Sequence, residues 1–135
     1  KLKRNSKHEE RPITNKSYEK INFHENVDPY QSSIFNERNS SNIRTIKSIS
    51  LNHLLDENKL SKVDYISIDT EGNEYDILSE FKFKKYDVKI FTIEHNYNKN
   101  KRKKIINIMK KNNYIRVHKN LSYMDDWFIK ENLNE

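Results

Sequence analysis

Five residues at the ends of two apolar runs are suited to chemistry. The stretch VDYISIDTEGNEYDIL places Asp69, Glu71 and Gly72, the single glycine of the chain, directly after a run typical of a strand. Glu94 and His95 end a second apolar run. Ligands of an open α/β sheet bind outside the carboxyl ends of its strands. If the two strands are neighbours, we expect three carboxylates and an imidazole to meet in one crevice, where Gly72 allows a positive φ or close approach of a ligand.

Two chemistries fit an Asp-x-Glu pattern at a strand end, and a purely structural role stays open beside them. The first is metal-dependent hydrolysis of phosphodiesters, with metal ions held by Asp69 and Glu71. Asn100 stands where such nucleases carry a second acid, and His118 and Asp125 are too far apart for their last motif. The second is group transfer, in which a carboxylate orients the acceptor and takes up its proton, and here no metal ligand is assigned. In the structural alternative, the two acids only cap the next helix.

The predicted elements that position these residues alternate along the chain. Strands are predicted at 21–24, 43–49, 63–69, 88–97, 114–118 and 124–129, and helices from Ser50, from about Asn73 and over 100–112. From residue 50 onward this order indicates an α/β fold whose sheet is mostly parallel with an antiparallel final strand. Apolar residues on both faces of strand 63–69 predict that it is covered on both sides. In the last strand, Trp127 and Phe128 are expected in the core, and Asp125 and Asp126 in its turn.

Composition limits the partners that the chain is expected to bind and the cellular compartment in which it is expected. A formal net charge of +6 permits attraction to nucleic acid, but the basic run 98–104 is more simply the solvated start of a helix. The absence of cysteine excludes disulfides and Cys-ligated zinc. No run reaches the roughly 18 apolar residues of a membrane span, and no apolar leader is seen, so a cytoplasmic protein is expected. Residues 1–20 are predicted as an irregular or disordered arm and residues 21–135 as the α/β domain.

The run 49–83, ISLNHLLDENKLSKVDYISIDTEGNEYDILSEFKF, resembles the FkbM family of S-adenosylmethionine-dependent methyltransferases. The pattern of that family is S-L-x-x-L-L, a short spacer, and D-[YF]-[IL]-x-[IL]-D-x-E-G-x-E followed by an I/V-L pair. QSSIF at 31–35, within a predicted turn and extended chain at 27–35, resembles the serine pair that precedes it, and FTIEHNY at 91–97 resembles the next strand. The resemblance covers about residues 27–131. The matching positions are Ser50, Leu51, Leu54, Leu55, Asp64, Tyr65, Ile66, Ile68, Asp69, Glu71, Gly72, Glu74, Ile77 and Leu78.

The resemblance implies a Rossmann-like class I methyltransferase fold with S-adenosylmethionine as cofactor. Such enzymes bind the cofactor mainly through a glycine-rich turn after the first strand and an acid ending the second, and both should lie N-terminal to the matching segment. Because Gly72 is the only glycine and the chain begins with Lys, we expect the C-terminal part of the domain, without its glycine-rich N-terminal half. Either upstream sequence is missing or the chain is a degenerate remnant. The implied reaction is methyl transfer to a hydroxyl of a small-molecule or glycan acceptor, such as a sugar or related natural product.

The resemblance also assigns roles to individual residues. These are Asp69, Glu71 and His95 for catalysis, Asp69 and Gly72 for cofactor binding, and Glu94 and Glu74 for substrate binding. Two other functions stay open: a non-catalytic remnant or interaction module of the same fold, and a basic metal-dependent nuclease or nucleic-acid-binding domain. An open sheet edge near strand 63–69 predicts pairing with another chain, such as a homodimer.

Overall fold

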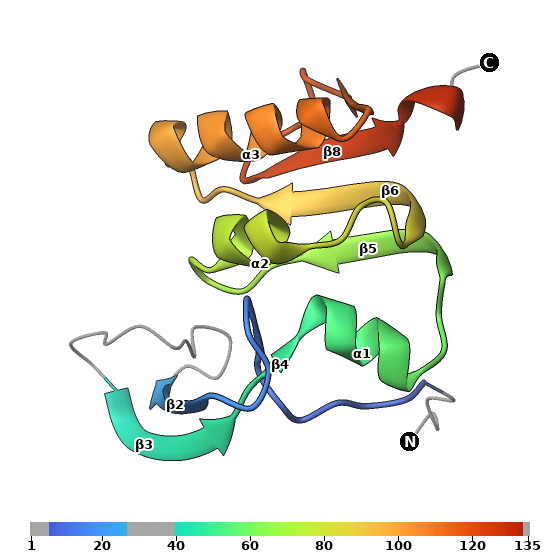
Figure 1. Cartoon of the computed structure of the whole chain (residues 1–135). Coiled ribbons are helices and arrows are strands. Elements are labelled where there is room, and N and C mark those ends of the chain that lie inside the picture. The colour runs from blue at the N-terminus through green and yellow to red at the C-terminus, as the bar shows by residue number, and fades with distance from the viewer. Residues whose placement is uncertain (1–5, 27–39, 134–135) are drawn as a thin grey trace.

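The computed structural model describes residues 6–26 and 40–133, which form an α/β structure with three helices (Figure 1). The predicted turn and serine pair at 27–35 lie outside these ranges. The helices are α1 (Leu51–Glu57), α2 (Glu74–Glu80) and α3 (Lys99–Lys111). The strands are β1 (Ile13–Thr14), β2 (Lys20–Asn26), β3 (Ser40–Lys47), β4 (Ile49–Ser50), β5 (Lys62–Ile68), β6 (Asp87–Glu94), β7 (Tyr114–Val117) and β8 (Asp125–Lys130), and a 3₁₀ turn follows at Glu131–Leu133. From residue 50, the predicted order of helices and strands is confirmed.

A four-stranded sheet with the order β5-β6-β8-β7 forms the centre of the structure. β5 and β6 pair in parallel, and β8 runs antiparallel to both of its neighbours. The prediction of parallel strands with an antiparallel final strand is confirmed for this sheet. Two smaller sheets join β1 to β4 in parallel and β2 to β3 in antiparallel fashion. β5 stands at an edge of the four-stranded sheet, as the sequence predicted.

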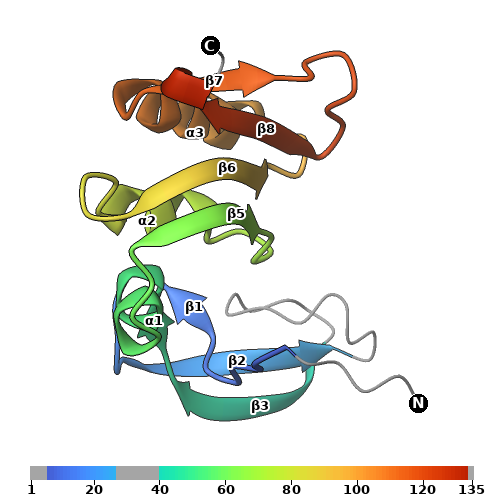
Figure 2. The same ribbon diagram turned by 90° about the vertical axis from the view of Figure 1, so that its right-hand side faces the viewer.

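Helices α2 and α3 cover one face of the four-stranded sheet (Figures 1 and 2). Their apolar residues pack on the strands in one cluster, to which α2 contributes Ile77 and Leu78. Ser50 caps α1 as predicted, because its hydroxyl accepts a hydrogen bond from the backbone N–H of His53 at 3.2 Å. The buried cluster consists of Leu51, Leu55, Ile68, Ile77, Leu78, Phe81, Tyr86, Val88, Phe91, Ile93, Ile105, Met109, Tyr114 and Phe128.

The opposite face of the sheet is open among the described residues, so the prediction that both faces of strand 63–69 are covered is wrong. Tyr65 on β5 is 49% exposed and Trp127 on β8 is 39% exposed, whereas Phe128 is buried as predicted. The rings of Tyr65 and Trp127 stack with centroids 6.4 Å apart. Alternate residues of a strand point to opposite faces, and α2 and α3 cover only one of them. The expectation that Trp127 lies in the core is therefore also wrong.

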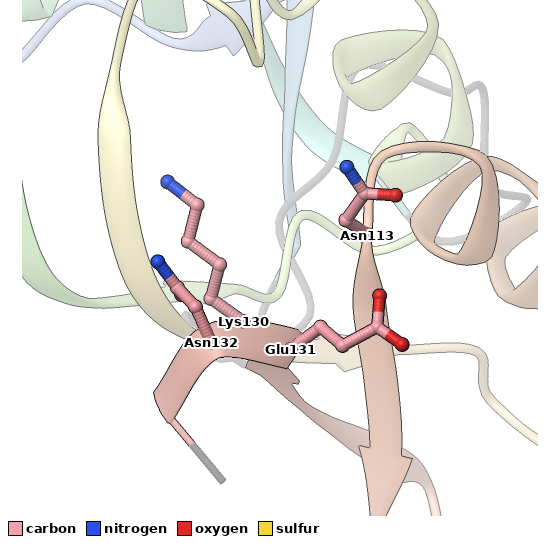
Figure 3. A pocket seen from close by; sticks show the side chains of 4 residues that line it. All are labelled: Asn113, Lys130, Glu131 and Asn132. Atoms are coloured by element: carbon pink, nitrogen blue, oxygen red, sulfur yellow. The ribbon is translucent and has the colours of Figure 1, made fainter. Parts of the chain in front are cut away.

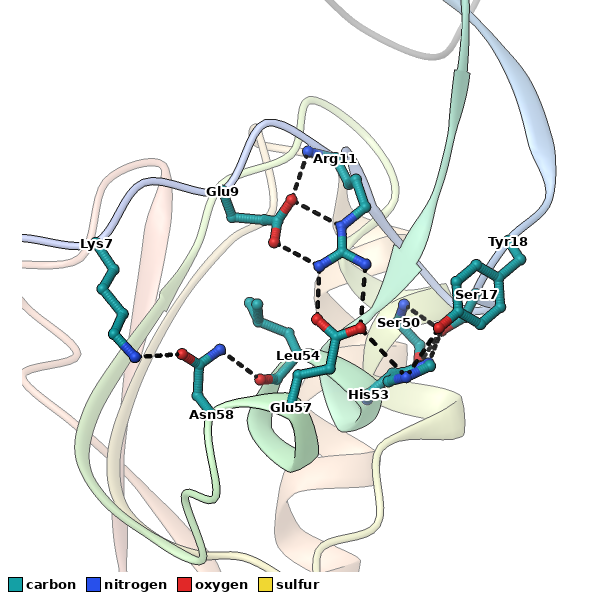
Figure 4. Close-up of polar contacts among 10 residues, drawn as sticks. All are labelled: Lys7, Glu9, Arg11, Ser17, Tyr18, Ser50, His53, Leu54, Glu57 and Asn58. Atoms are coloured by element: carbon teal, nitrogen blue, oxygen red, sulfur yellow. Dashed lines mark hydrogen bonds and ion pairs between the residues drawn. The ribbon is translucent and has the colours of Figure 1, made fainter.

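Residues 6–20, expected to be an irregular or disordered arm, are mostly loop but contact the rest of the structure. β1 pairs with β4, and Thr14 is buried. The guanidinium of Arg11 forms ion pairs with Glu9 and, across the fold, with Glu57 of α1 at 2.6 Å (Figure 4). The hydroxyl of Ser17 accepts a hydrogen bond from the backbone N–H of Ser50, the residue that caps α1. The helices in the described ranges are too short and too polar to cross a membrane.

A buried ion pair ties β8 to α3 and β7. Asp125 and Asp126, both expected in a turn, lie within β8, which corrects that expectation, and Asp126 is fully buried. Its carboxylate accepts two hydrogen bonds from Arg102 of α3, each 2.8 Å long, and one from Arg116 of β7 at 2.7 Å. Burial alone would raise the pKa of Asp126, but the two guanidinium groups outweigh this effect and hold the pKa below its usual value. Asp126 therefore acts as a charged link between three elements.

We predict that Asp126→Asn lowers the free energy of unfolding at neutral pH by roughly 3 kcal/mol, because two arginines lose a buried counter-charge. The exposed neighbour provides a matched control: Asp125→Asn should stay within about 0.5 kcal/mol of the parent chain. Since the folded pKa of Asp126 is depressed, its stabilisation is present above the usual pKa and is lost as the pH falls through the folded pKa. Urea unfolding should show that Asp126→Asn is less stable than the parent chain at neutral pH and that this difference shrinks in acid. Equal effects of the two substitutions would contradict this role.

Candidate functional site

The carboxyl ends of β5 and β6 bring three carboxylates together. The strands are parallel neighbours, and their last paired residues are Ile68 and Ile93. Asp69 and Glu94 each come one position later, so they stand side by side and on the same face of the sheet. One carboxylate oxygen from each of Asp69, Glu71 and Glu94 lies within 4.8 Å of the others. The predicted adjacency of the two strands, with Asp69 and Glu94 close together at their ends, is thus confirmed.

The loop that carries Asp69 and Glu71 is organised by the buried carboxylate of Glu74. Its Oε1 accepts hydrogen bonds from the backbone N–H of Thr70 and of Gly72, both 2.9 Å long, and from the hydroxyl of Thr70 at 3.1 Å. Its Oε2 pairs with Nζ of Lys101 on α3 at 3.1 Å. Burial would raise the pKa of Glu74, but these hydrogen bonds hold the pKa below its usual value. The side chain proposed for substrate binding is therefore engaged within the protein.

The backbone of this loop adopts left-handed conformations. Gly72 has a φ of 129°, which glycine reaches without the penalty of a Cβ atom, and Glu71 has a φ of 54°. At the end of β6, Asn96 and Tyr97 also have positive φ angles. Non-glycine residues with positive φ are uncommon and gather at functional sites. Both strand ends that carry the carboxylates thus leave the sheet through sharp turns.

Glu94 is the most enclosed of the three carboxylates. The residue is 6% exposed, and its Oε2 atom has no hydrogen-bond partner among the described residues. Burial raises the pKa of Glu94 to about 7, reinforced by the negative charges of Asp69 and Glu71. In contrast, Asp69 is exposed and Glu71 is half-buried. The cluster therefore has a buried floor at Glu94 and an accessible rim at Asp69.

His95 lies apart from the three carboxylates. It directly follows Glu94 and so points to the other face of the sheet, where its Nε2 is 3.9 Å from Asp126. Its Nδ1 accepts a hydrogen bond from the backbone N–H of Tyr97 at 3.2 Å. Burial lowers the pKa of His95 below its usual value. The imidazole is thus not part of the carboxylate cluster, where the sequence pattern had placed it.

Three contacts around the cluster have no obvious signal in the sequence. Lys101 reaches Glu74 from α3, and the Asn73 side chain donates a hydrogen bond to the backbone of Ile13, which ties the loop to β1. On the open sheet face, the hydroxyl of buried Thr92 contacts that of Tyr65 at 2.6 Å. Only the basic run that contains Lys101 could have suggested a partner for an acid, and it does not say which one.

A hollow lined by Asn113, Lys130, Glu131 and Asn132 lies away from this cluster (Figure 3). Asn113 precedes β7, and Lys130 ends β8 and pairs with Asp87 at the start of β6. The hollow is therefore at the amino end of β6, opposite the end that carries Glu94. Ligands of α/β sheets bind at the carboxyl ends of parallel strands, so we place the candidate site at the carboxylates.

Comparison with protein families gives one match that bears on this site. The family model described as Methyltransferase FkbM domain matches residues 3–116. The match includes Asp69, Glu71 and Glu94 and begins earlier in the chain than the resemblance seen in the sequence. Searches of curated proteins and of solved structures gave no match.

We predict that Glu74→Ala loosens the loop and lowers the free energy of unfolding by about 2–3 kcal/mol, since it removes hydrogen bonds to a charged, buried group. Amide hydrogen exchange at Thr70 and Gly72 should accelerate by about tenfold or more, because their N–H groups lose the acceptor. Glu80→Ala, at an exposed position of the same helix, should change neither quantity. Unchanged exchange at both amides in Glu74→Ala would show that Glu74 does not hold the loop.

Proposed function

The chain belongs to the FkbM methyltransferase domain family, and from this membership we propose that it acts in transfer of a methyl group from S-adenosylmethionine to a hydroxyl group. The observation that carries the proposal is the convergence of Asp69, Glu71 and Glu94 at the carboxyl ends of two parallel strands. The acceptor we propose is a small molecule or glycan, such as a sugar or related natural product. The matching α/β topology supports a Rossmann-like domain of which this chain contributes the β5–β8 sheet.

The residues present fit one side of the cofactor. When bound, S-adenosylmethionine supplies an electrophilic methyl group on a positively charged sulfonium. Carboxylates at the strand ends suit a cationic ligand, because opposite charges attract most strongly where water is partly excluded. The chain has a single glycine, however, so it cannot supply a glycine-rich turn. We propose that Asp69 and Gly72 border the methyl-donating end and that other sequence holds the rest of the cofactor.

Asp69 is the residue we propose to handle the acceptor. It is exposed, so a hydroxyl can approach it, and it stands beside the buried Glu94. The bound cofactor would supply its methyl group to the acceptor oxygen, and a carboxylate oxygen of Asp69 would take up the hydroxyl proton. Positioning of the acceptor and removal of its proton both lower the barrier. Glu71 and Glu94 would orient the acceptor from the two strand ends.

The basic run on α3 gives little support to a nucleic-acid-binding function. Lys101 pairs with Glu74, Arg102 pairs with Asp126, and Lys104 lies over the ring of Tyr75. Cations that are paired within the protein are less available to neutralise phosphates, which is the main source of nucleic-acid affinity. We therefore propose that nucleic acid is not the partner of this chain.

The cofactor part of the proposal is tested by calorimetry with S-adenosylmethionine. The titration uses this chain and the same chain extended upstream through its reading frame. We expect saturable binding by the extended chain and weak or no binding by this chain alone, because the latter lacks a glycine-rich turn. Failure of both chains to bind would overturn the methyltransferase proposal and favour a non-catalytic relative of the family.

The role of Asp69 is tested in whichever chain binds the cofactor. Asp69→Asn keeps the size of the side chain but removes the proton acceptor, so methyl transfer should fall by about 100-fold or more. Asp64→Asn, on the exposed part of the same strand, is the matched control and should retain the parent rate. Transfer is followed by release of S-adenosylhomocysteine with a panel of sugar acceptors. Equal rates for the two variants would remove Asp69 from the reaction.

A further inference from the structure

Asp69 and Glu94 differ from two buried acids elsewhere in the structure, Glu74 and Asp126, in how their charge is balanced. Glu74 has Lys101 as its counter-charge, and Asp126 has Arg102 and Arg116. Within residues 6–26 and 40–133, no cationic side chain forms a salt bridge with Asp69 or Glu94. Like charges this close repel, and the repulsion grows as the site is buried. Among the described residues, the carboxylates of Asp69 and Glu94 therefore have no salt bridge that balances their charge.

Glu94 supplies a second and separate observation. The side chain is more than nine-tenths buried, and it is one of the three residues whose oxygens converge. Its Oε2 atom receives no hydrogen bond from the described residues. A buried acceptor without a donor costs free energy, so such atoms in native proteins usually have a partner that explains them. A cation bound at this oxygen would satisfy its lone pair and balance the negative charge of the neighbouring carboxylates.

We propose that Asp69, Glu71 and Glu94 bind one divalent cation of the oxygen-preferring class, Mg²⁺, Mn²⁺ or Ca²⁺. The spacing supports this proposal. Oxygen ligands of Ca²⁺ stand about 2.3–2.6 Å from the ion, so opposite ligands are about 4.6–5.2 Å apart and adjacent ones are closer. The three carboxylate oxygens lie within 4.8 Å of one another, which this geometry accommodates. The smaller Mg²⁺ requires the same side chains to close by a fraction of an ångström.

The ligand set selects the class of cation. All three donors are carboxylate oxygens, which suit Mg²⁺, Ca²⁺ and Mn²⁺, and the chain contains no cysteine thiolate to favour softer metals. The imidazole of His95 points to the other sheet face, so it does not add a nitrogen ligand. Three protein ligands leave coordination positions for water or for oxygen atoms of another molecule.

The position of the ion would matter for the chemistry. Asp69 forms the accessible rim of the cluster, so the open coordination positions face solvent at the carboxyl ends of β5 and β6. A cation there would bind an acceptor hydroxyl directly and make it easier to deprotonate. This consequence rests on the proposed methyl transfer, whereas binding of the cation does not.

The test is binding of Mn²⁺ to this chain, followed by the loss of the electron paramagnetic resonance signal of the free ion. We expect one Mn²⁺ per chain with a dissociation constant of about 1 mM or tighter, in the range of weak carboxylate sites, and displacement by Mg²⁺ or Ca²⁺. Glu94→Gln and Asp69→Asn should each weaken binding by about tenfold or more, since each removes a charged ligand. Glu94→Gln also removes repulsion within the cluster, so we expect it to fold.

Asp64→Asn is the matched control, because this exposed aspartate lies on β5 outside the cluster, and it should bind as the parent chain does. Circular dichroism verifies that each variant is folded. The proposal is overturned if the folded parent chain shows no saturable binding up to about 10 mM Mn²⁺, ten times the weakest constant expected. It is also overturned if Glu94→Gln and Asp69→Asn both bind as tightly as Asp64→Asn. Because the readout is the ion itself, a failed methyl-transfer assay does not affect this result.

Discussion

The buried carboxylate of Glu74 is the interaction on which the candidate site depends. It gathers the backbone N–H groups of Thr70 and Gly72 on one oxygen and the ammonium of Lys101 on the other. A buried charge is stable only when its hydrogen bonds and counter-charge are supplied together. The same contacts that stabilise Glu74 therefore fix the turn after β5 and connect it to α3. These contacts hold the turn that places Asp69 and Glu71 beside Glu94.

The sheet contributes the other half of the arrangement. Parallel pairing in register brings the ends of β5 and β6 to the same level, so residues that follow the two strands become neighbours. Because alternate side chains of a strand point to opposite faces of the sheet, Asp69 and Glu94 lie on one face. His95 lies on the other face, beside Asp126. One sheet end thus carries an acidic cluster on one face and a charged network with two arginines on the other.

The order of elements and the meeting of Asp69 with Glu94 could be predicted from the sequence, because apolar periodicity and strand ends are local signals. The separation of His95 from Glu94 follows from the same alternation and could have been predicted. The role of Glu74 could not, because it depends on a left-handed turn that brings two amides to one oxygen. The burial of Asp126 depends on arginines from two distant elements, and the exposure of Trp127 depends on which face the helices cover. Long-range packing decides these features.

The stacked rings on the open sheet face give the protein a built-in optical reporter. Trp127 is the only tryptophan of the chain, and it pairs across the sheet with Thr92, two residues before Glu94. Its indole is partly in contact with water and partly against Tyr65. Tryptophan emission shifts with the polarity around the ring, so anything that covers this face would change the colour of the fluorescence without a label. Binding of a partner over Trp127 can therefore be followed in the unmodified chain.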